Sequence, residues 1–160
     1  MKERMKRIDK ILLTTLSTQA AASPRKRAHH NLHPQLDDKV QRLCIAMEPG
    51  TYVRPHRHNQ PETWEILLIL SGAVALLIFD DSGRVLERIE LAAGGEVTAV
   101  EIPANTWYAV ASLKAGTVVF EVKQGPYAPI NEANYAPWSA CGRDRRNRWR
   151  AGSLGDTVPK

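Results

Sequence analysis

Two histidines and a carboxylate lie close together in the stretch RPHRHNQPETWEIL, residues 54–67. On a β-strand alternate side chains share a face, so Arg54, His56 and His58 are expected to point the same way. Glu65 opens a strongly apolar run, where a carboxylate is costly unless it is paired or bound to a metal. Two imidazole nitrogens and one carboxylate oxygen are the ligand set of an open divalent-metal site, suited to Fe, Mn, Ni or Zn.

The same residues also have a metal-free interpretation. A His-x-His pair on a strand is more often a surface or structural pair than a metal site. Arg54 shares the face of His56, and together they could bind a phosphate or a carboxylate. The residues by themselves therefore leave a metal site and an anion pocket open.

The elements that would position these residues are mostly strands. One amphipathic helix is predicted over the first twenty or so residues, because apolar side chains recur at helical spacing at Ile8, Ile11, Leu12 and Leu16. Short β-rich runs follow, most of them bounded by turn residues: VQRLCIAM, TYVRPH, EILLIL, AVALLIF, VLERIEL, VTAVEI, TWYAVA and TVVFEV. Strands with no helices between them are typical of an antiparallel sandwich or barrel.

The chain divides into three segments by this pattern. Residues 1–30 are expected to form the helix and a basic linker, residues 31–125 the all-β domain, and residues 126–160 a C-terminal loop and an Arg-rich tail. The formal charge of +5 comes from the two ends, and no nucleic-acid-binding motif accompanies it. Nucleic-acid binding is therefore not expected.

The number of cysteines and the hydropathy of the chain indicate the cellular compartment of the protein. The two cysteines, Cys44 and Cys141, give no disulfide framework and fit a reducing compartment, with Cys44 expected to be buried. Asp9 and Lys10 interrupt the first apolar run, which argues against a signal peptide. No stretch approaches the roughly 18 apolar residues of a membrane span. A cytoplasmic location is predicted.

Gly50, His56, His58, Glu65 and Gly72 together resemble the first metal-binding motif of the cupins, which are small jelly-roll barrels. The gap before the carboxylate is longer than in most cupins. Glu65 is nevertheless preferred as the third ligand, since it starts the strand and has the right distance to the following glycine. The alternative, Glu62, follows a proline in the expected turn.

The second cupin motif is matched by EIPANTWYAV with two departures. Asn105 stands where the motif has Gly, and Asn tolerates the left-handed conformation of a turn. Tyr108 stands where the motif has His. Its phenol could ligate a metal, could hydrogen-bond a bound water, or could mark a weakened site.

Longer stretches resemble one family within the cupins. From about Pro24 to Trp138 the chain is similar to the WbuC family of cupin-fold metalloproteins, in PRKRAHHNLHPQLDDKVQRL, IAMEPGTYVRPHRH, LLIFDDSGRVLER, EIPANTWYAV and TVVFEVKQGPYAP. The family's usual pattern has His at the position of Tyr108. The resemblance implies a jelly-roll barrel and, by analogy with such barrels, a homodimer.

The function implied is a metal-binding cupin that acts on a sugar or sugar-nucleotide in surface-polysaccharide synthesis. His56, His58 and Glu65 would be ligands, and Tyr108 a fourth ligand or the catalytic acid/base. A second hypothesis is a non-catalytic module that binds a sugar or another small anion, with the metal site weakened or lost. A third is an oxygen-using Fe(II) enzyme.

Five further residues are candidates for contact with the ligand. Arg54 and Lys123 would hold its anionic group, although Lys123 could instead pair with Glu121 on the same strand. Asn31 and His33 could line the mouth of the pocket or cap a turn before the first strand. Trp107 could stack on a sugar with Trp64 and Trp138, or all three could fill core.

Overall fold

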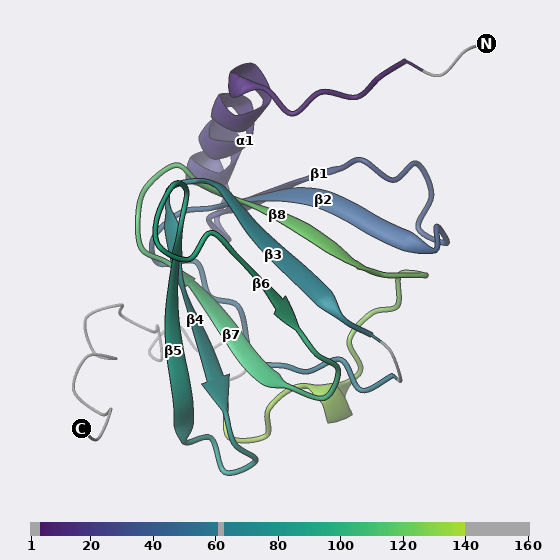
Figure 1. Ribbon diagram of the computed structural model, residues 1–160, viewed down its shortest axis with the longest axis vertical. Coiled ribbons are helices and arrows are strands. Elements are labelled where there is room, and N and C mark those ends of the chain that lie inside the picture. Colours follow the sequence, from purple (N-terminus) through teal and green to yellow (C-terminus); the bar gives the residue numbers. More distant parts are fainter. Residues whose placement is uncertain (1–3, 61–62, 140–160) are drawn as a thin grey trace.

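The computed structural model describes residues 4–60 and 63–139, a chain of short strands that follow one helix (Figure 1). The elements are α1 (Lys10–Ala22), β1 (Arg27–Asn31), β2 (Val40–Met47), β3 (Glu65–Ser71), β4 (Ala73–Phe79), β5 (Val85–Ala92), β6 (Ala99–Ile102), β7 (Trp107–Ser112), β8 (Thr117–Gln124) and the 3-10 turn η1 (Glu132–Asn134). The helix begins where the side chain of Asp9 caps the N–H of Leu12. Among the described residues, no helix has both the length and the apolar character that a membrane crossing needs.

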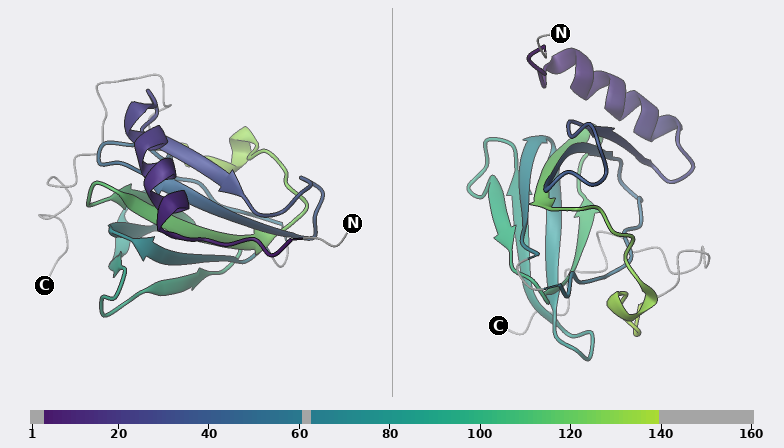
Figure 2. Two further views of the ribbon diagram at one scale, coloured as in Figure 1. Left: turned by 90° about the horizontal axis from the view of Figure 1, so that it is seen from above. Right: turned by 90° about the vertical axis from the view of Figure 1, so that its right-hand side faces the viewer.

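The strands form two antiparallel sheets that lie against each other. One sheet has the order β1-β2-β8-β3-β6 and the other the order β5-β4-β7. The helix α1 lies outside the barrel, where Leu16 and Ala20 pack on Cys44 and Val118 of β2 and β8 (Figure 2). The predicted all-β jelly-roll with an N-terminal helix is therefore confirmed, as is the burial of Cys44.

The main core lies between the two sheets. Its buried members come from both of them: Met47, Leu67, Ile69, Val74, Leu76, Leu91, Ile102, Tyr108 and Val119. A smaller cluster lies on the outer side of β4 and β7, where Leu77, Phe79, Trp107 and Ala109 are covered by Ala136. Neighbouring residues of β7 thus belong to opposite sides of the sheet, as strand geometry requires.

The chain passes from one sheet to the other at Gly72. This residue has φ +73° and lies against the side chain and backbone of Thr117. Only glycine fits, since a Cβ would meet Thr117 and an L side chain rarely adopts this backbone conformation. The turn sets β3, which carries Glu65, against β8.

Two predictions about strands were wrong. Residues 27–30 are predicted to belong to the basic linker, but Arg27–Asn31 forms β1, an edge strand whose sequence RAHHN has no apolar alternation to reveal it. TYVRPH was assigned to a strand, but only His56 makes isolated bridges, to Tyr108 and Tyr135. Pro55 has no N–H to donate to a ladder. The Arg-rich tail and Cys141 lie outside the described residues, as does Glu62.

Candidate functional site

A cavity of about 1450 Å³ opens on the inner face of the five-stranded sheet. Alternate residues of β1, β2, β3 and β8 form its floor, and Tyr108 and Val110 of β7 form one wall. The loop segments 50–60 and 126–135 border the rest. The cavity is large enough for a sugar-sized or larger ligand.

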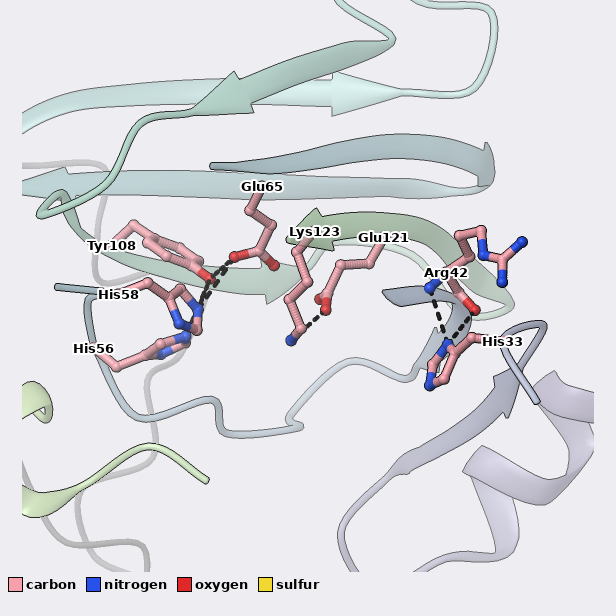
Figure 3. Close-up of polar contacts among 8 residues, drawn as sticks. All are labelled: His33, Arg42, His56, His58, Glu65, Tyr108, Glu121 and Lys123. Carbon is pink, nitrogen blue, oxygen red and sulfur yellow. Dashed lines mark hydrogen bonds and ion pairs between the residues drawn. The ribbon is translucent and has the colours of Figure 1, made fainter. Parts of the chain in front are cut away.

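The four predicted metal-site residues meet at one end of this cavity (Figure 3). The hydroxyl of Tyr108 donates to Glu65 Oε2 at 2.5 Å and lies 3.1 Å from His56 Nε2. It also lies 3.5 Å from His58 Nε2, which is 3.3 Å from Glu65 Oε2. The phenol oxygen is thus the centre of the group, which we call the Tyr108 hub: His56, His58, Glu65 and Tyr108.

The backbone explains why these side chains converge. His56 and Tyr108 exchange two backbone hydrogen bonds of 3.1 Å, so their side chains emerge next to each other. The carbonyl of His58 accepts from the N–H of Asn105 at 2.7 Å. Asn105 has φ +63°, the left-handed conformation expected for this position. Glu65 enters from the opposite sheet as the first residue of β3.

The orientation of His56 is fixed by its own backbone neighbour. Its Nδ1 lies 2.8 Å from the carbonyl oxygen of Arg54, which only accepts, so Nδ1 carries the proton. Burial, together with the neighbouring His58, lowers the pKa of His56 to about 4, so the ring is neutral at pH 7. Nε2 therefore presents a lone pair to the hub. Metal-binding histidines are held by the same kind of outer hydrogen bond.

Protonation of the other hub residues follows from burial and charge. Burial, followed by the charges of Glu65 and Glu121, raises the pKa of Tyr108 well above its usual value. Burial alone would raise the pKa of Glu65, but hydrogen bonds with His58 and Glu121 and the charge of Lys123 hold it at about 2. A neutral phenol thus donates its only proton to an ionised carboxylate.

A buried carboxyl and a lysine lie beside the hub. Lys123 Nζ is 2.7 Å from Glu121 Oε1, so the predicted pairing of these two residues is confirmed. In the sheet, Lys123 is directly opposite Glu65. Burial, and then the charge of Glu65, raises the pKa of Glu121 to about 8. Sequence reasoning did not place Glu121 next to Glu65, although a glutamate at an inward position of β8 was a signal.

The donor set fits an ion only if Tyr108 is part of it. The separations of 3.1, 3.3 and 3.5 Å are close to the edges of a tetrahedron of ligands, about 3.3–3.4 Å for bonds of about 2.0–2.1 Å. The 2.5 Å bond between Tyr108 and Glu65 is too short for two ligands and would have to lengthen. Among the described residues, His, Cys, Asp and Glu side chains alone form no group that could hold a metal.

Two other residues were predicted to contact the ligand, but Arg54 already has partners and Trp107 lies outside the cavity. Arg54 pairs with Glu132 at 2.9 Å, donates to Ser139 and lies over the ring of Tyr135. Its charge therefore holds the segment after β8. Trp107 is buried on the outer side of β7, so the structure does not bring it to the cavity and its predicted stacking role has no support.

Asn31 and His33 line the cavity at a distance from the hub (Figure 3 shows His33). His33 is 5% exposed, and its Nδ1 accepts from the backbone N–H of Arg42 at 2.9 Å. This bond fits the predicted structural role before β2. The second ring nitrogen, Nε2, is buried and has no hydrogen-bond partner among the described residues.

A family model described as "Domain of unknown function (DUF6016)" matches residues 8–91. The chain belongs to this DUF6016 family. The match spans α1 to β5, and so it includes the hub residues His56, His58 and Glu65 but ends before Tyr108. It does not confirm the predicted membership of the WbuC family. No curated protein matches the chain.

Solved structures similar to the DUF6016 chain support its fold. KdgF from Halomonas sp. is 17% identical with a TM-score of 0.51, over 66% of this chain and 84% of its own. The SPY1581 protein of unknown function from Streptococcus pyogenes is 18% identical with a TM-score of 0.52, over 79% and 92%. At such identities the likeness concerns the fold alone.

Proposed function

We propose that this DUF6016 protein binds a divalent metal ion at the Tyr108 hub and a sugar-sized, anionic small molecule in the adjoining cavity. The observation that carries the proposal is the convergence of two imidazole nitrogens and a carboxylate oxygen on one phenol oxygen. The outer hydrogen bond from His56 to the Arg54 carbonyl supports it, because this bond leaves Nε2 free to ligate.

Each hub residue has a defined part in this proposal. His56, His58 and Glu65 would hold the ion, which would be Fe, Mn, Ni or Zn. Such an ion supplies Lewis-acid chemistry toward a carbonyl or vicinal hydroxyls. Tyr108 would be the fourth donor, as the spacing requires, and its oxygen would exchange a proton with the ligand as acid/base. The part in surface-polysaccharide synthesis is drawn only from the sequence resemblance to the WbuC family, and the cytoplasmic location and homodimer also stay predictions.

A non-catalytic binding protein is the second candidate. The observation that favours it is the 2.5 Å hydrogen bond from Tyr108 to Glu65, which already gives the buried carboxylate a partner without any ion. In that case the hub would be a polar end of the cavity that binds ligand hydroxyl groups, with no turnover.

Metal analysis of tag-free protein separates the two candidates. We expect close to one ion per chain after loading with Mn, Fe, Ni or Zn and desalting, and a higher melting temperature in the loaded protein. The variant His58→Ala should lose both effects. His30→Ala removes an exposed histidine of β1 and is the matched control, so it should retain them.

One result of this experiment would rule out the metal proposal, and another would place the ion at a different site. If the wild type keeps no stoichiometric ion and none of the four metals shifts its melting temperature, the metal proposal fails. Binding of sugars to the metal-free protein, measured by calorimetry, would then support the second candidate. If His58→Ala retains as much metal as the wild type, the ion lies at a different place.

A further inference from the structure

Two buried hydrogen-bond donors without partners line the cavity away from the Tyr108 hub. The first is Nε of Arg27, on β1, which makes no hydrogen bond among the described residues. The second is Nε2 of His33. The backbone N–H of Arg42 donates to Nδ1 at 2.9 Å, and the Arg42 carbonyl oxygen lies 3.0 Å from the same atom. In the tautomer that accepts at Nδ1, the proton is on Nε2. A buried donor without a partner costs free energy, so both positions favour a ligand that brings acceptors.

Positive charge accompanies these donors. Among the described residues that line the cavity, the acids are Glu65 and Glu121 and the cations are Arg25, Arg27, Arg54, Arg57 and Lys123. Burial lowers the pKa of His29, and the charges of Arg27, Arg25 and Lys123 lower it further. These cations therefore act together on the β1 side of the cavity.

The two cations predicted from the sequence to bind an anion already contact acidic side chains. Arg54 pairs with Glu132, and Lys123 pairs with Glu121. Arg27 forms no ion pair with any described residue, and it is half-buried with its side chain toward the cavity. A planar guanidinium in this position suits an oxyanion, which it can bind through two parallel hydrogen bonds.

We infer that the β1 side of the cavity, with Arg27 as the donor, binds an oxyanion group of the ligand, a phosphate or a carboxylate, while Nε2 of His33 faces a separate part of the ligand. The strand β1 is separated from β3 by β2 and β8, which is about 14 Å across the sheet at about 4.8 Å per strand. Arg27 also lies at the level of Met47, six residues along β2 from Gln41, which is at the level of Lys123 and Glu65. The ligand is therefore extended, with its charged group at Arg27 and its other end at the Tyr108 hub. Only the placing of that other end rests on the proposed function.

Calorimetry with three sugars of similar size tests the inference. The probes are glucose 1-phosphate, glucuronate and uncharged glucose, titrated at low salt into the full chain. At least one charged probe should bind, and glucose should bind at least about tenfold more weakly. Arg27→Gln should weaken the charged probe by about tenfold or more and leave glucose unchanged. Arg88→Gln removes the same charge from β5 of the other sheet and is the matched control.

Each outcome decides for or against the oxyanion site. A preference for glucose 1-phosphate or for glucuronate identifies the oxyanion. Equal weakening by Arg27→Gln and Arg88→Gln, or equal affinity for glucose and both charged probes, overturns the inference, as does a failure of both charged probes to bind. If Arg27→Gln does not fold, Arg27→Lys replaces it and should give a smaller but measurable loss.

Titrations in chelator separate this inference from the proposed metal site. Binding that persists in chelator and depends on Arg27 supports the oxyanion site even if the metal proposal fails. If the charged probe no longer binds in chelator, and Arg27→Gln binds it as tightly as the wild type does without chelator, the anion binds to the metal ion. That result overturns the inference.

Discussion

Replacing Tyr108 with Phe removes the phenol oxygen, which takes part in every hub contact described above except that between His58 and Glu65. The ring stays in the main core, so the loss is confined to the hydroxyl, its hydrogen bond to Glu65 and its contact with His56 Nε2. A hydrogen bond to a charged group contributes about 1.5–3 kcal/mol, and here the carboxylate that loses it stays buried. We expect the free energy of unfolding of the metal-free protein to fall by about 2 kcal/mol at pH 7, and Tm by about 4–8 °C.

Urea denaturation in chelator measures this loss, and its pH dependence identifies the partner. The pKa of Glu65 in the folded protein is about 2, below its usual value. Its stabilising contribution is therefore present above the unfolded pKa of about 4.3 and is lost as the pH falls toward 2. The difference between wild type and Tyr108→Phe should shrink over the same window.

A matched control makes the test specific. Tyr127→Phe removes a hydroxyl from a side chain that is 50% exposed, and should change the free energy of unfolding by less than about 0.5 kcal/mol. If Tyr108→Phe costs no more than this control, or if its cost is the same at pH 7 and at pH 2, the phenol is not the hydrogen-bond centre of the site.

Three further substitutions test the site and the fold. Tyr108→His should raise the affinity for divalent metal in a competition titration with a chelator, and an unchanged affinity would place residue 108 outside the coordination sphere. Gly72→Ala should lower the free energy of unfolding by at least about 2 kcal/mol, through strain and a clash. Gly116→Ala has the same φ of +73° but open space, so it should cost only about 1 kcal/mol, and equal losses would refute the clash. Leu76→Ala should cost about 2–5 kcal/mol in urea, whereas the exposed Leu86→Ala should be near neutral; similar values would contradict the assignment of the core.

The sequence predicted the barrel because most of its strands bury one or both faces. β3, β4, β7 and β8 are rich in apolar and β-branched residues, which are the local signal of a strand. β1 is an open edge strand with polar side chains, and it is defined only by its pairing with β2. The local sequence pattern therefore did not predict β1. It also predicted a strand wrongly at residues 51–56, which have alternation but no neighbouring strand along their length.

The candidate site was predictable in part, because motif spacing depends on a few neighbouring residues. His56, His58, Glu65 and Tyr108 were proposed from the cupin motifs, and they meet in space. Arg27 and Glu121 were not joined to the site. Their positions depend on which strands are neighbours and in what register, and these are properties of the topology that no short stretch of sequence carries.

The proton count of the Tyr108 hub explains why one structure supports both a metal site and a metal-free pocket. His56 uses its proton on the Arg54 carbonyl, and Tyr108 uses its proton on Glu65. Two lone pairs then face each other across the 3.1 Å between His56 Nε2 and the phenol oxygen. A cation would satisfy both, and so would a hydroxyl proton of a ligand. The hub therefore needs one more cation or hydrogen-bond donor than the chain supplies. Arg54 and Lys123 cannot provide it while they are paired with Glu132 and Glu121.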